Sequence, residues 1–418
     1  MSAYLLPADI LLPDFTKVDG SKWAVVACDQ YTSEPAYWEG VEAEVGEAPS
    51  TLRVTLPEIY LEHSADRVPA IQDTMNTYIR ELLVTHQSKM IYLERTQSNG
   101  RVRRGLVGMV DLEQYDYRAG SRSLIRATEG TVLERIPPRL AVRRGAALEL
   151  PHVMLLIDDP KKTVIEPIAA RAQELPEAYD FSLMQKSGSV KGRFVDTVGI
   201  GRISAALERL ISPENLRARY GEGVAPLLFA VGDGNHSLAT AKAAYEEIKA
   251  AHGEAALYHP ARYALVEVVN LHDEALHFEP IYRVMFHVDP NDVLAALEEY
   301  SFSLCGDAAP QQARFLSATR RGTIHFGTPR EQLVVGTLQT FIDGYLATHP
   351  EATVDYIHGS KTVEALSARE DAVGFLFSGM SKDELFPAVM RDGALPRKTF
   401  SMGAAADKRF YLECRKIR

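Results

Sequence analysis

The clearest change of pattern in the chain is Pro226-Leu227-Leu228-Phe229-Ala230-Val231-Gly232-Asp233-Gly234-Asn235-His236-Ser237-Leu238-Ala239-Thr240-Ala241. The short apolar run at 227–231 predicts a buried strand. Two glycines and three polar residues follow it, and the small residues after them predict a helix over Ser237–Ala251. A strand, a glycine-rich turn and a helix in succession are typical of α/β proteins.

The same alternation continues through the second half of the chain and changes character in the first half. The later strand patterns are Arg262–Asn270, Thr323–Phe326, Gln332–Val335, Val354–Ile357 and Val373–Phe377, with helical patterns at Pro290–Tyr300 and Thr337–Ala347 and after Ser360 and Ser381. In the first half, Met90–Arg95 and Arg103–Asp111 flank a turn at 98–100 and predict an antiparallel hairpin. Trp23–Cys28 is a further predicted strand, and Ala70–Thr85 is a predicted helix. We therefore expect an α/β fold with a mixed sheet, and α+β is the alternative.

The length bounds the number of domains. A chain of 418 residues accommodates two or three domains of ordinary size. No obvious linker marks a boundary between them. We expect an N-terminal α/β region with hairpins at 1–150, and a C-terminal α/β region at 151–418 that carries the Gly-Asp-Gly-Asn-His turn.

Composition and charge exclude several classes of function. The formal net charge is −10, from 46 basic and 56 acidic side chains, so a general nucleic-acid partner is not expected. The apolar runs are too short to span a bilayer and the first residues do not resemble a signal peptide, so we expect cytoplasmic location and no membrane partner. Cys28, Cys305 and Cys414 are widely spaced, which predicts neither disulfides nor a cysteine zinc site. Self-association into a homo-oligomer stays open.

The turn at 232–237 is the strongest candidate site. Gly232 and Gly234 let the backbone approach a ligand closely, and the free N–H groups and positive dipole at a helix start attract an anion. Asp233 can hold a metal or orient a hydroxyl group, and His236 can contact phosphate or move a proton. The structural alternative is a tight turn whose own side chains, Ser237 or Asn235, cap the helix.

Other polar loops follow predicted strands, and in an open α/β sheet such loops line the ligand crevice. They contribute the candidate substrate residues Asp29, Gln30, Tyr31 and His358. A segment that gathers arginines around hydroxyls and a carboxylate adds Arg126, Thr128 and Glu129, and a short loop before the last predicted strand adds the candidate phosphate-binding residues Arg397 and Lys398. Helix capping, surface ion pairs or a solvated basic turn are the alternatives for these segments. At Ser381 the spacing to Glu384 predicts a capping box.

Five stretches along nearly the whole chain resemble the bacterial and archaeal family known as domain of unknown function 1015. They are Ala27–Pro35, Ser123–Thr131, Leu156–Pro160, Gly232–His236 and Leu395–Met402. That family has no established activity, so the resemblance implies membership without implying a reaction.

A shorter resemblance says more about chemistry. The sequence Asp233-Gly234-Asn235-His236, followed by a helix of small residues, is similar to the Asp-Gly-x-His-Arg signature of ParB, sulfiredoxin and free-serine kinase proteins. This resemblance implies that nucleotide phosphates contact Gly234, Asn235, His236 and Ser237. Arginine is usual at the position of Ser237, so a cation is expected from elsewhere, the candidates being Lys242, Arg397 and Lys398.

Two functional hypotheses follow. The first is a phosphotransferase or phosphohydrolase that uses a nucleotide, ATP or ADP, together with Mg²⁺ and acts on a small hydroxylated metabolite. In it Asp233 is the metal or base residue and acts with His236, while Arg397 and Lys398 neutralise developing charge. The second is a non-catalytic sensor that binds a nucleotide or metabolite at the same turn.

Overall fold

The computed structural model describes residues 4–118, 120–130, 136–304 and 311–418. The chain forms two compact units. The first comprises Met1–Ala127, Thr131–Leu276 and Ala404–Arg418, and the second comprises Thr128–Gly130 and His277–Gly403. Cys305 and Thr131 lie outside the described residues. These units differ from the division expected at residue 150, because strands from both sides of that residue pair in one sheet.

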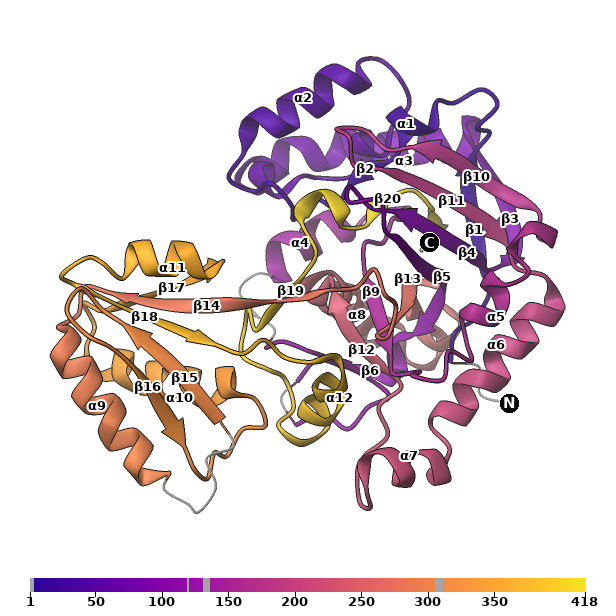
Figure 1. Cartoon of the computed structure of the whole chain (residues 1–418). Coiled ribbons are helices and arrows are strands. Elements are labelled where there is room, and N and C mark those ends of the chain that lie inside the picture. Colours follow the sequence, from indigo (N-terminus) through magenta and orange to yellow (C-terminus); the bar gives the residue numbers. More distant parts are fainter. Residues whose placement is uncertain (1–3, 119, 131–135, 305–310) are drawn as a thin grey trace. The chain divides into compact units, whose positions relative to one another are not determined.

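A mixed sheet forms the framework of the first unit (Figure 1). Among the described residues it has nine strands, in the order β10 (Glu177–Ser182), β11 (Ser189–Phe194), β4 (Ile91–Thr96), β5 (Val102–Asp111), β13 (Tyr263–Asn270), β9 (Met154–Ile157), β12 (Phe229–Asp233), β7 (Ile125–Ala127) and β6 (Tyr115–Asp116). Strand β12 runs parallel to β7 and antiparallel to β9, whereas β9 runs parallel to β13. Strands β4 and β5 form the predicted hairpin. The expected α/β fold with a mixed sheet is thereby confirmed.

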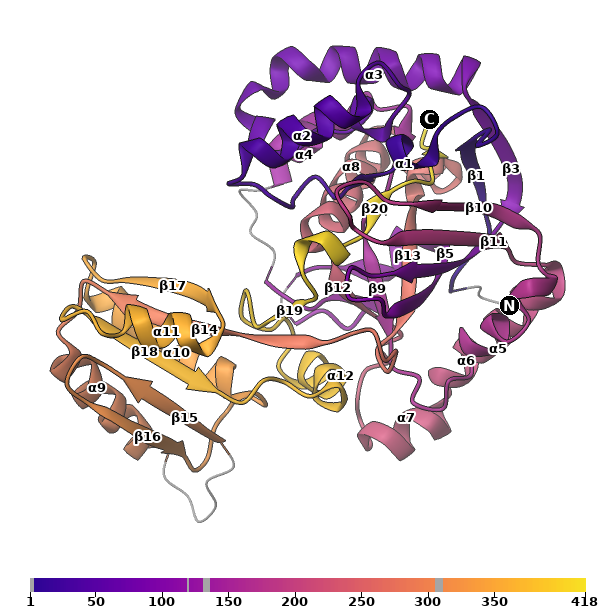
Figure 2. The same cartoon turned by 45° about the horizontal axis from the view of Figure 1, so that its top comes forward.

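Helices and strands cover both faces of this sheet (Figures 1 and 2). Because successive strand residues point to opposite faces, Val266 and Val268 of β13 pack on one face and Leu265 on the other. The first face packs against α5 (Glu166–Ala169), α6 (Thr197–Leu210) and α8 (Asn235–His252), and the second against α1 (Gly20–Trp23), α2 (Pro35–Val45) and α3 (Ser64–Glu81). Helix α4 (Ile136–Arg143) packs on α8, and α7 (Pro213–Tyr220) follows α6. None of the helices in the described ranges is long and apolar enough to cross a membrane.

The C-terminal segment, residues 404–418, returns to the first unit as two short strands. Strand β20 (Phe410–Tyr411) pairs with β2 (Val25–Val26), and β21 (Arg415–Lys416) pairs with β8 (Leu148–Glu149). The predicted strand Trp23–Cys28 is therefore too long, because Asp19 caps a short helix that ends at Trp23. The predicted helix Ala70–Thr85 starts earlier and ends at Glu81, since β3 (Leu83–Lys89) pairs with β1 (Ala8–Pro13).

The second unit has its own sheet, whose strand pairs are all antiparallel. Its order is β16 (Arg321–Phe326), β15 (Gln311–Leu316), β18 (Ala372–Phe377), β14 (Phe278–Phe286) and β17 (Thr353–His358), with β19 (Phe400–Met402) paired to β14. Its helices are α9 (Pro290–Ser303), α10 (Val334–Thr348), α11 (Ser360–Leu366) and α12 (Lys382–Arg391). The predicted strand Gln332–Val335 is wrong, because α10 begins at Val334 and buries Val335. The predicted capping box at α12 is present, with Glu384 accepting from the Ser381 amide at 2.8 Å.

Candidate functional site

The turn between β12 and α8 requires glycine at its centre. Gly234 has φ +78° and ψ 28°, a left-handed conformation that other residues rarely adopt. A Cβ atom added to Gly234 would lie 3.0 Å from Cα of Val153 and 3.4 Å from Cδ2 of His152. The Gly234 amide donates to Oδ1 of Asp233 at 2.9 Å. The backbone conformation and the close approach to the segment before β9 therefore both require glycine at position 234.

The first turn of α8 has no capping side chain among the described residues. Gly234 is the N-cap residue, so neither Ser237 nor Asn235 caps the helix as the structural alternative supposed. Asn235, His236 and Ser237 are each partly exposed, and Asn235 Oδ1 is buried without a hydrogen-bond partner in the described part of the chain. The first N–H groups of a helix lack intrahelical acceptors. The start of α8 therefore carries backbone N–H donors that no side chain of the described residues caps.

A cation stands beside this turn. Lys408 Nζ lies 3.2 Å from Oδ2 of Asp233, and the two side chains are 13% and 18% exposed. Lys408 belongs to the C-terminal segment, just before β20. Of the cations considered from the sequence, Lys242 pairs with Glu246 at 2.6 Å, and Arg397 and Lys398 belong to the second unit. Lys408 was not considered from the sequence, and the structure places it at the turn.

A histidine also lies beside the turn. Because β12 and β9 run antiparallel with Asp233 opposite Met154, His152, two residues before Met154, lies next to the turn. His152 is buried, and its Nε2 lies 3.6 Å from Oδ2 of Asp29, whose side chain is 29% exposed. Gln30 Nε2 donates to the second Asp29 oxygen at 3.0 Å. The structure therefore brings two predicted residues, Asp29 and Asp233, to a histidine that sequence reasoning missed.

Electrostatics favour an ion pair between His152 and Asp29. Burial lowers the pKa of His152, but the Asp29 carboxylate and, further away, Asp233 and Glu58 outweigh burial and raise the pKa above 6.5. Burial raises the pKa of Asp29, but His152, Gln30 and Lys408 outweigh it and hold the pKa well below 3.8. At neutral pH Asp29 is therefore a charged, partly exposed hydrogen-bond acceptor.

Hydrogen bonds continue from His152 to Cys28. Tyr411 Oη donates to Cys28 Sγ at 2.9 Å, and His152 Nδ1 lies 2.9 Å from the same Oη. With the tyrosine proton on the sulfur side, Nδ1–H of His152 donates to Oη. Burial and the nearby Asp29 raise the pKa of Cys28 to about 12. The thiol is consequently protonated, and its position indicates a supporting role rather than a nucleophilic one.

A further charged pair lies close to Cys28. The Glu58 amide donates to the carbonyl oxygen of Cys28 at 2.9 Å, and the Glu58 carboxylate pairs with Arg139 of α4. Both side chains are mostly buried. We call the group formed by Asp29, His152, Asp233 and Lys408 the turn cluster. Glu58 is near this cluster, and its charge helps to raise the pKa of His152.

Arg126 and Tyr31, which were also predicted, have other partners within the first unit. Arg126 is buried and donates to the carbonyls of Ser123 and Pro226, at 2.8 and 2.7 Å. Tyr31 has φ +53° and stacks on Tyr37 with a centroid separation of 3.6 Å. The others belong to the second unit: Thr128 is buried, Glu129 is partly exposed, and His358, Arg397 and Lys398 are exposed.

The residues at the turn do not fit a protein-held Mg²⁺ ion. Asp233 offers one carboxylate, and Lys408 pairs with it. Across the described ranges, no three side chains of His, Cys, Asp or Glu come together as metal ligands. Mg²⁺ is commonly bound by one or two carboxylates together with substrate phosphates. Any metal at this turn would therefore take most of its ligands from a nucleotide.

Fold and site together define an α/β protein with a mixed sheet and a strand–glycine–helix turn beside a charged cluster. The model of the family described as "Protein of unknown function (DUF1015)" matches residues 13–366, so the chain belongs to that family. No curated protein sequence matches the chain.

Several solved structures are similar to the chain at low identity. A free serine kinase in complex with AMP is 10% identical with a TM-score of 0.39, over 75% of this chain and 91% of that chain. A conserved hypothetical protein from Pyrococcus furiosus is 12% identical with a TM-score of 0.36, over 75% and 95%. SbnI with a C-terminal truncation, from Staphylococcus aureus, is 9% identical with a TM-score of 0.36, over 73% and 85%. Likenesses at these scores do not assign an activity to this chain.

Proposed function

We propose that the chain binds a nucleotide through its phosphates at the start of α8 and transfers a phosphoryl group to a small hydroxylated metabolite. One observation carries this proposal: the uncapped first turn of α8 adjoins Asp233, which holds Lys408 at 3.2 Å. Backbone N–H groups at a helix start bind phosphate, and a nearby cation strengthens such binding. Asn235, His236 and Ser237 supply the contacts on the helix, and Lys408 supplies the positive charge.

The turn cluster also offers a group for the acceptor substrate. Asp29 is ionised and partly exposed, with His152 and Gln30 fixing its two oxygens. In phosphoryl transfer a carboxylate commonly accepts the proton of the attacking hydroxyl. The substrate oxygen attacks the terminal phosphorus of ATP or ADP, the bond to the leaving phosphate oxygen breaks, and the hydroxyl proton passes to Asp29. Asp233 acts in this scheme by orienting Lys408, and His236 acts as a phosphate contact.

Phosphorus NMR on the purified chain tests the proposal. The chain is mixed with ATP or ADP and a panel of small alcohols, hydroxy amino acids and sugars, and a new phosphate ester is expected. Asp29→Asn should abolish the ester while nucleotide binding persists. Asp116→Asn is the matched control, since that carboxylate is 26% exposed, pairs with Arg118 at 2.9 Å and lies on β6, two strands from β12.

Each result decides between the proposal and its alternatives. Release of inorganic phosphate without a new ester identifies a phosphohydrolase. Saturable nucleotide binding without any turnover, across the whole panel, identifies a sensor. Absence of nucleotide binding removes the proposal altogether.

A further inference from the structure

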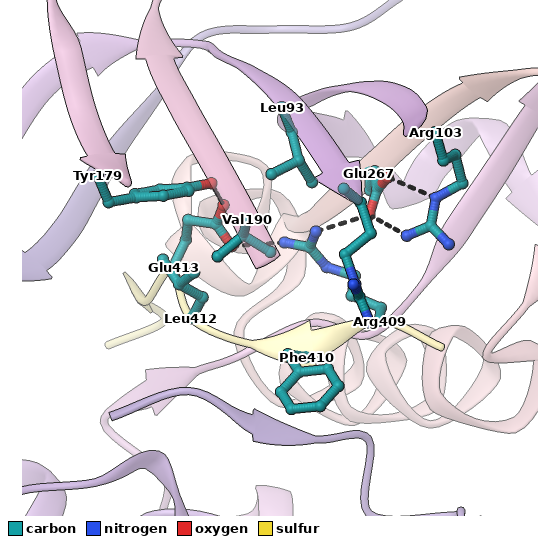
Figure 3. Close-up of a pocket in the computed structure, with 10 residues that line it drawn as sticks. Leu93, Arg103, Tyr179, Val190, Glu267, Arg409, Phe410, Leu412 and Glu413 are labelled. Atoms are coloured by element: carbon teal, nitrogen blue, oxygen red, sulfur yellow. Dashed lines mark hydrogen bonds and ion pairs between the residues drawn. The ribbon is translucent and has the colours of Figure 1, made fainter. Parts of the chain in front are cut away.

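Arg409 is a fully engaged guanidinium in the interior of the first unit. Its side chain is 4% exposed, and its Nε donates to the carbonyl oxygen of Pro151 at 3.1 Å. One terminal nitrogen donates to Glu267 Oε2 at 2.7 Å, and the other donates to Glu413. Figure 3 shows Arg409 between the two glutamates, with Arg103 reaching Glu267 from the other side. All three guanidinium nitrogens of Arg409 therefore have acceptors.

Arg409 is bonded to residues that lie close in the sequence to members of the turn cluster. Pro151, whose carbonyl it holds, directly precedes His152. Lys408 directly precedes Arg409 in the chain. The Arg409 carbonyl accepts from the Ala27 amide at 3.0 Å, two residues before Asp29. One buried residue thus connects the three segments that carry Asp29, His152 and Lys408.

Glu267, which accepts a hydrogen bond from Arg409, belongs to the large sheet of the first unit. Glu267 is fully buried on β13, opposite Met154 of β9, and its amide donates to the Val153 carbonyl at 3.0 Å. A Cβ on Gly105 would lie 2.6 Å from Glu267 Oε1, so glycine on β5 leaves room for the carboxylate. The space beside these side chains is about 10 Å³, enough for about one water molecule. The buried group of Arg409, Glu267 and Arg103 is therefore tightly packed and leaves no room for a substrate.

We propose that Arg409 is a positioning residue that holds His152 and Lys408 in register with the turn, through its bonds to Pro151 and Glu267. The inference deepens the proposed function and rests on it for its consequence in ligand binding. A planar guanidinium serves three acceptors in fixed directions, which a lysine ammonium cannot reproduce. A substitution that weakens the hydrogen bonds of Arg409 but keeps its positive charge should therefore displace the residues of the turn cluster.

The test compares Arg409→Lys with Arg415→Lys. Arg415 lies on the same C-terminal segment, pairs with the buried Glu149 at 2.7 Å and donates to the carbonyls of Pro260 and Tyr263, but, in the described part of the chain, none of these partners is hydrogen-bonded to or paired with a residue of the turn cluster. Two quantities are measured on folded full-length protein. They are the Kd for ADP by calorimetry and the pKa of the His152 imidazole by NMR, assigned from the signal lost in His152→Gln.

Arg409→Lys should weaken ADP binding on the order of tenfold to a hundredfold, as expected when a remote change misplaces binding groups. It should also move the pKa of His152 toward 6.5, since the contact with Asp29 loosens. Arg415→Lys should leave both quantities unchanged. If Arg409→Lys does not fold, Glu413→Gln replaces it, because this change loosens one of the three bonds and should give smaller shifts in the same directions.

An unchanged pKa of His152 in a folded Arg409→Lys protein overturns the positioning role, and so do equal effects from Arg415→Lys. If wild-type protein binds no ADP, the proposed function fails while the NMR measurement still decides whether Arg409 positions His152. The two failures are therefore distinguishable.

Discussion

Asp233 Oδ2 and Lys408 Nζ lie 3.2 Å apart, although nearly the whole second unit lies between them in the sequence. Asp233 ends β12, and Lys408 belongs to the C-terminal segment that returns to the first unit at Ala404. The contact completes a group of charges at the start of α8. The last residues of the chain therefore contribute to the candidate site as well as to the fold.

Removal of the Lys408 charge should weaken nucleotide binding. Lys408→Met removes a charge-assisted contact to phosphate, and such contacts contribute about 1.5–3 kcal/mol, or roughly ten- to a hundredfold in Kd. Calorimetric titration with ADP measures the change. Lys242→Met is the control, because Lys242 is 15% exposed and pairs with Glu246 on α8 itself. Equal Kd values for Lys408→Met and wild type would remove Lys408 from the site.

Gly234, at the start of α8, should be more sensitive to substitution than Gly253 at the other end of the same helix. Gly234→Ala incurs the left-handed conformation, about 1–2 kcal/mol, and in addition a 3.0 Å contact with Val153. Gly253→Ala is the matched control, since Gly253 has φ +59° at the other end of α8 and an added Cβ would meet nothing within 4 Å. Chemical denaturation should show a larger loss of unfolding free energy for Gly234→Ala. A larger loss at Gly253 would contradict the close approach to Val153.

The ion pair between His152 and Asp29 should make stability depend on pH. The contribution of Asp29, whose pKa is lowered, is fully present above pH 3.8 and is lost as pH falls through the folded value. The contribution of His152, whose pKa is raised, is fully present below pH 6.5 and is lost as pH rises through the folded value. Unfolding free energies of wild type and His152→Gln should therefore differ most between about pH 4 and 6.5. A difference that grows above that range would show that His152 is neutral in the folded chain.

Cys28 should resist alkylation despite its partial exposure. With a pKa of about 12, roughly one thiol in ten thousand is ionised at pH 8, and the thiolate is the reactive form. Iodoacetamide treatment of a Cys305→Ser variant, followed by peptide mass spectrometry, measures the modified fraction at Cys28. Modification as fast as that of a free cysteine would show that Tyr411 and Asp29 do not surround the thiol as described.

Local patterns predicted the elements that carry the turn. The apolar run and the two glycines located β12, the turn and the start of α8 within two residues, because strand periodicity and glycine conformation are encoded in neighbouring residues. The strand predicted at Gln332–Val335 shows the opposite case. Its valines favour strand by propensity, yet burial of one face of α10 makes them helical.

The partners at the turn could not be read from the same patterns. His152 reaches Asp233 through the register of β9 against β12, and Tyr411 reaches Cys28 through the pairing of β20 with β2. Such registers depend on pairing across long sequence separations, which single-sequence periodicity does not specify. A signal was present in Lys408-Arg409 and Glu413, charges that flank the apolar run Phe410–Leu412 and are buried in the structure or nearly so.

If the proposed function is correct, the backbone amides that open α8 bind phosphate. Titration of isotopically labelled protein with ADP, followed through backbone amide NMR signals, is the decisive test of this binding. We predict saturable shifts that are largest at Gly234, Asn235 and Ser237 and that are lost in Lys408→Met. Saturation of ADP binding while these three amide signals stay in place, or the absence of any binding, would contradict it.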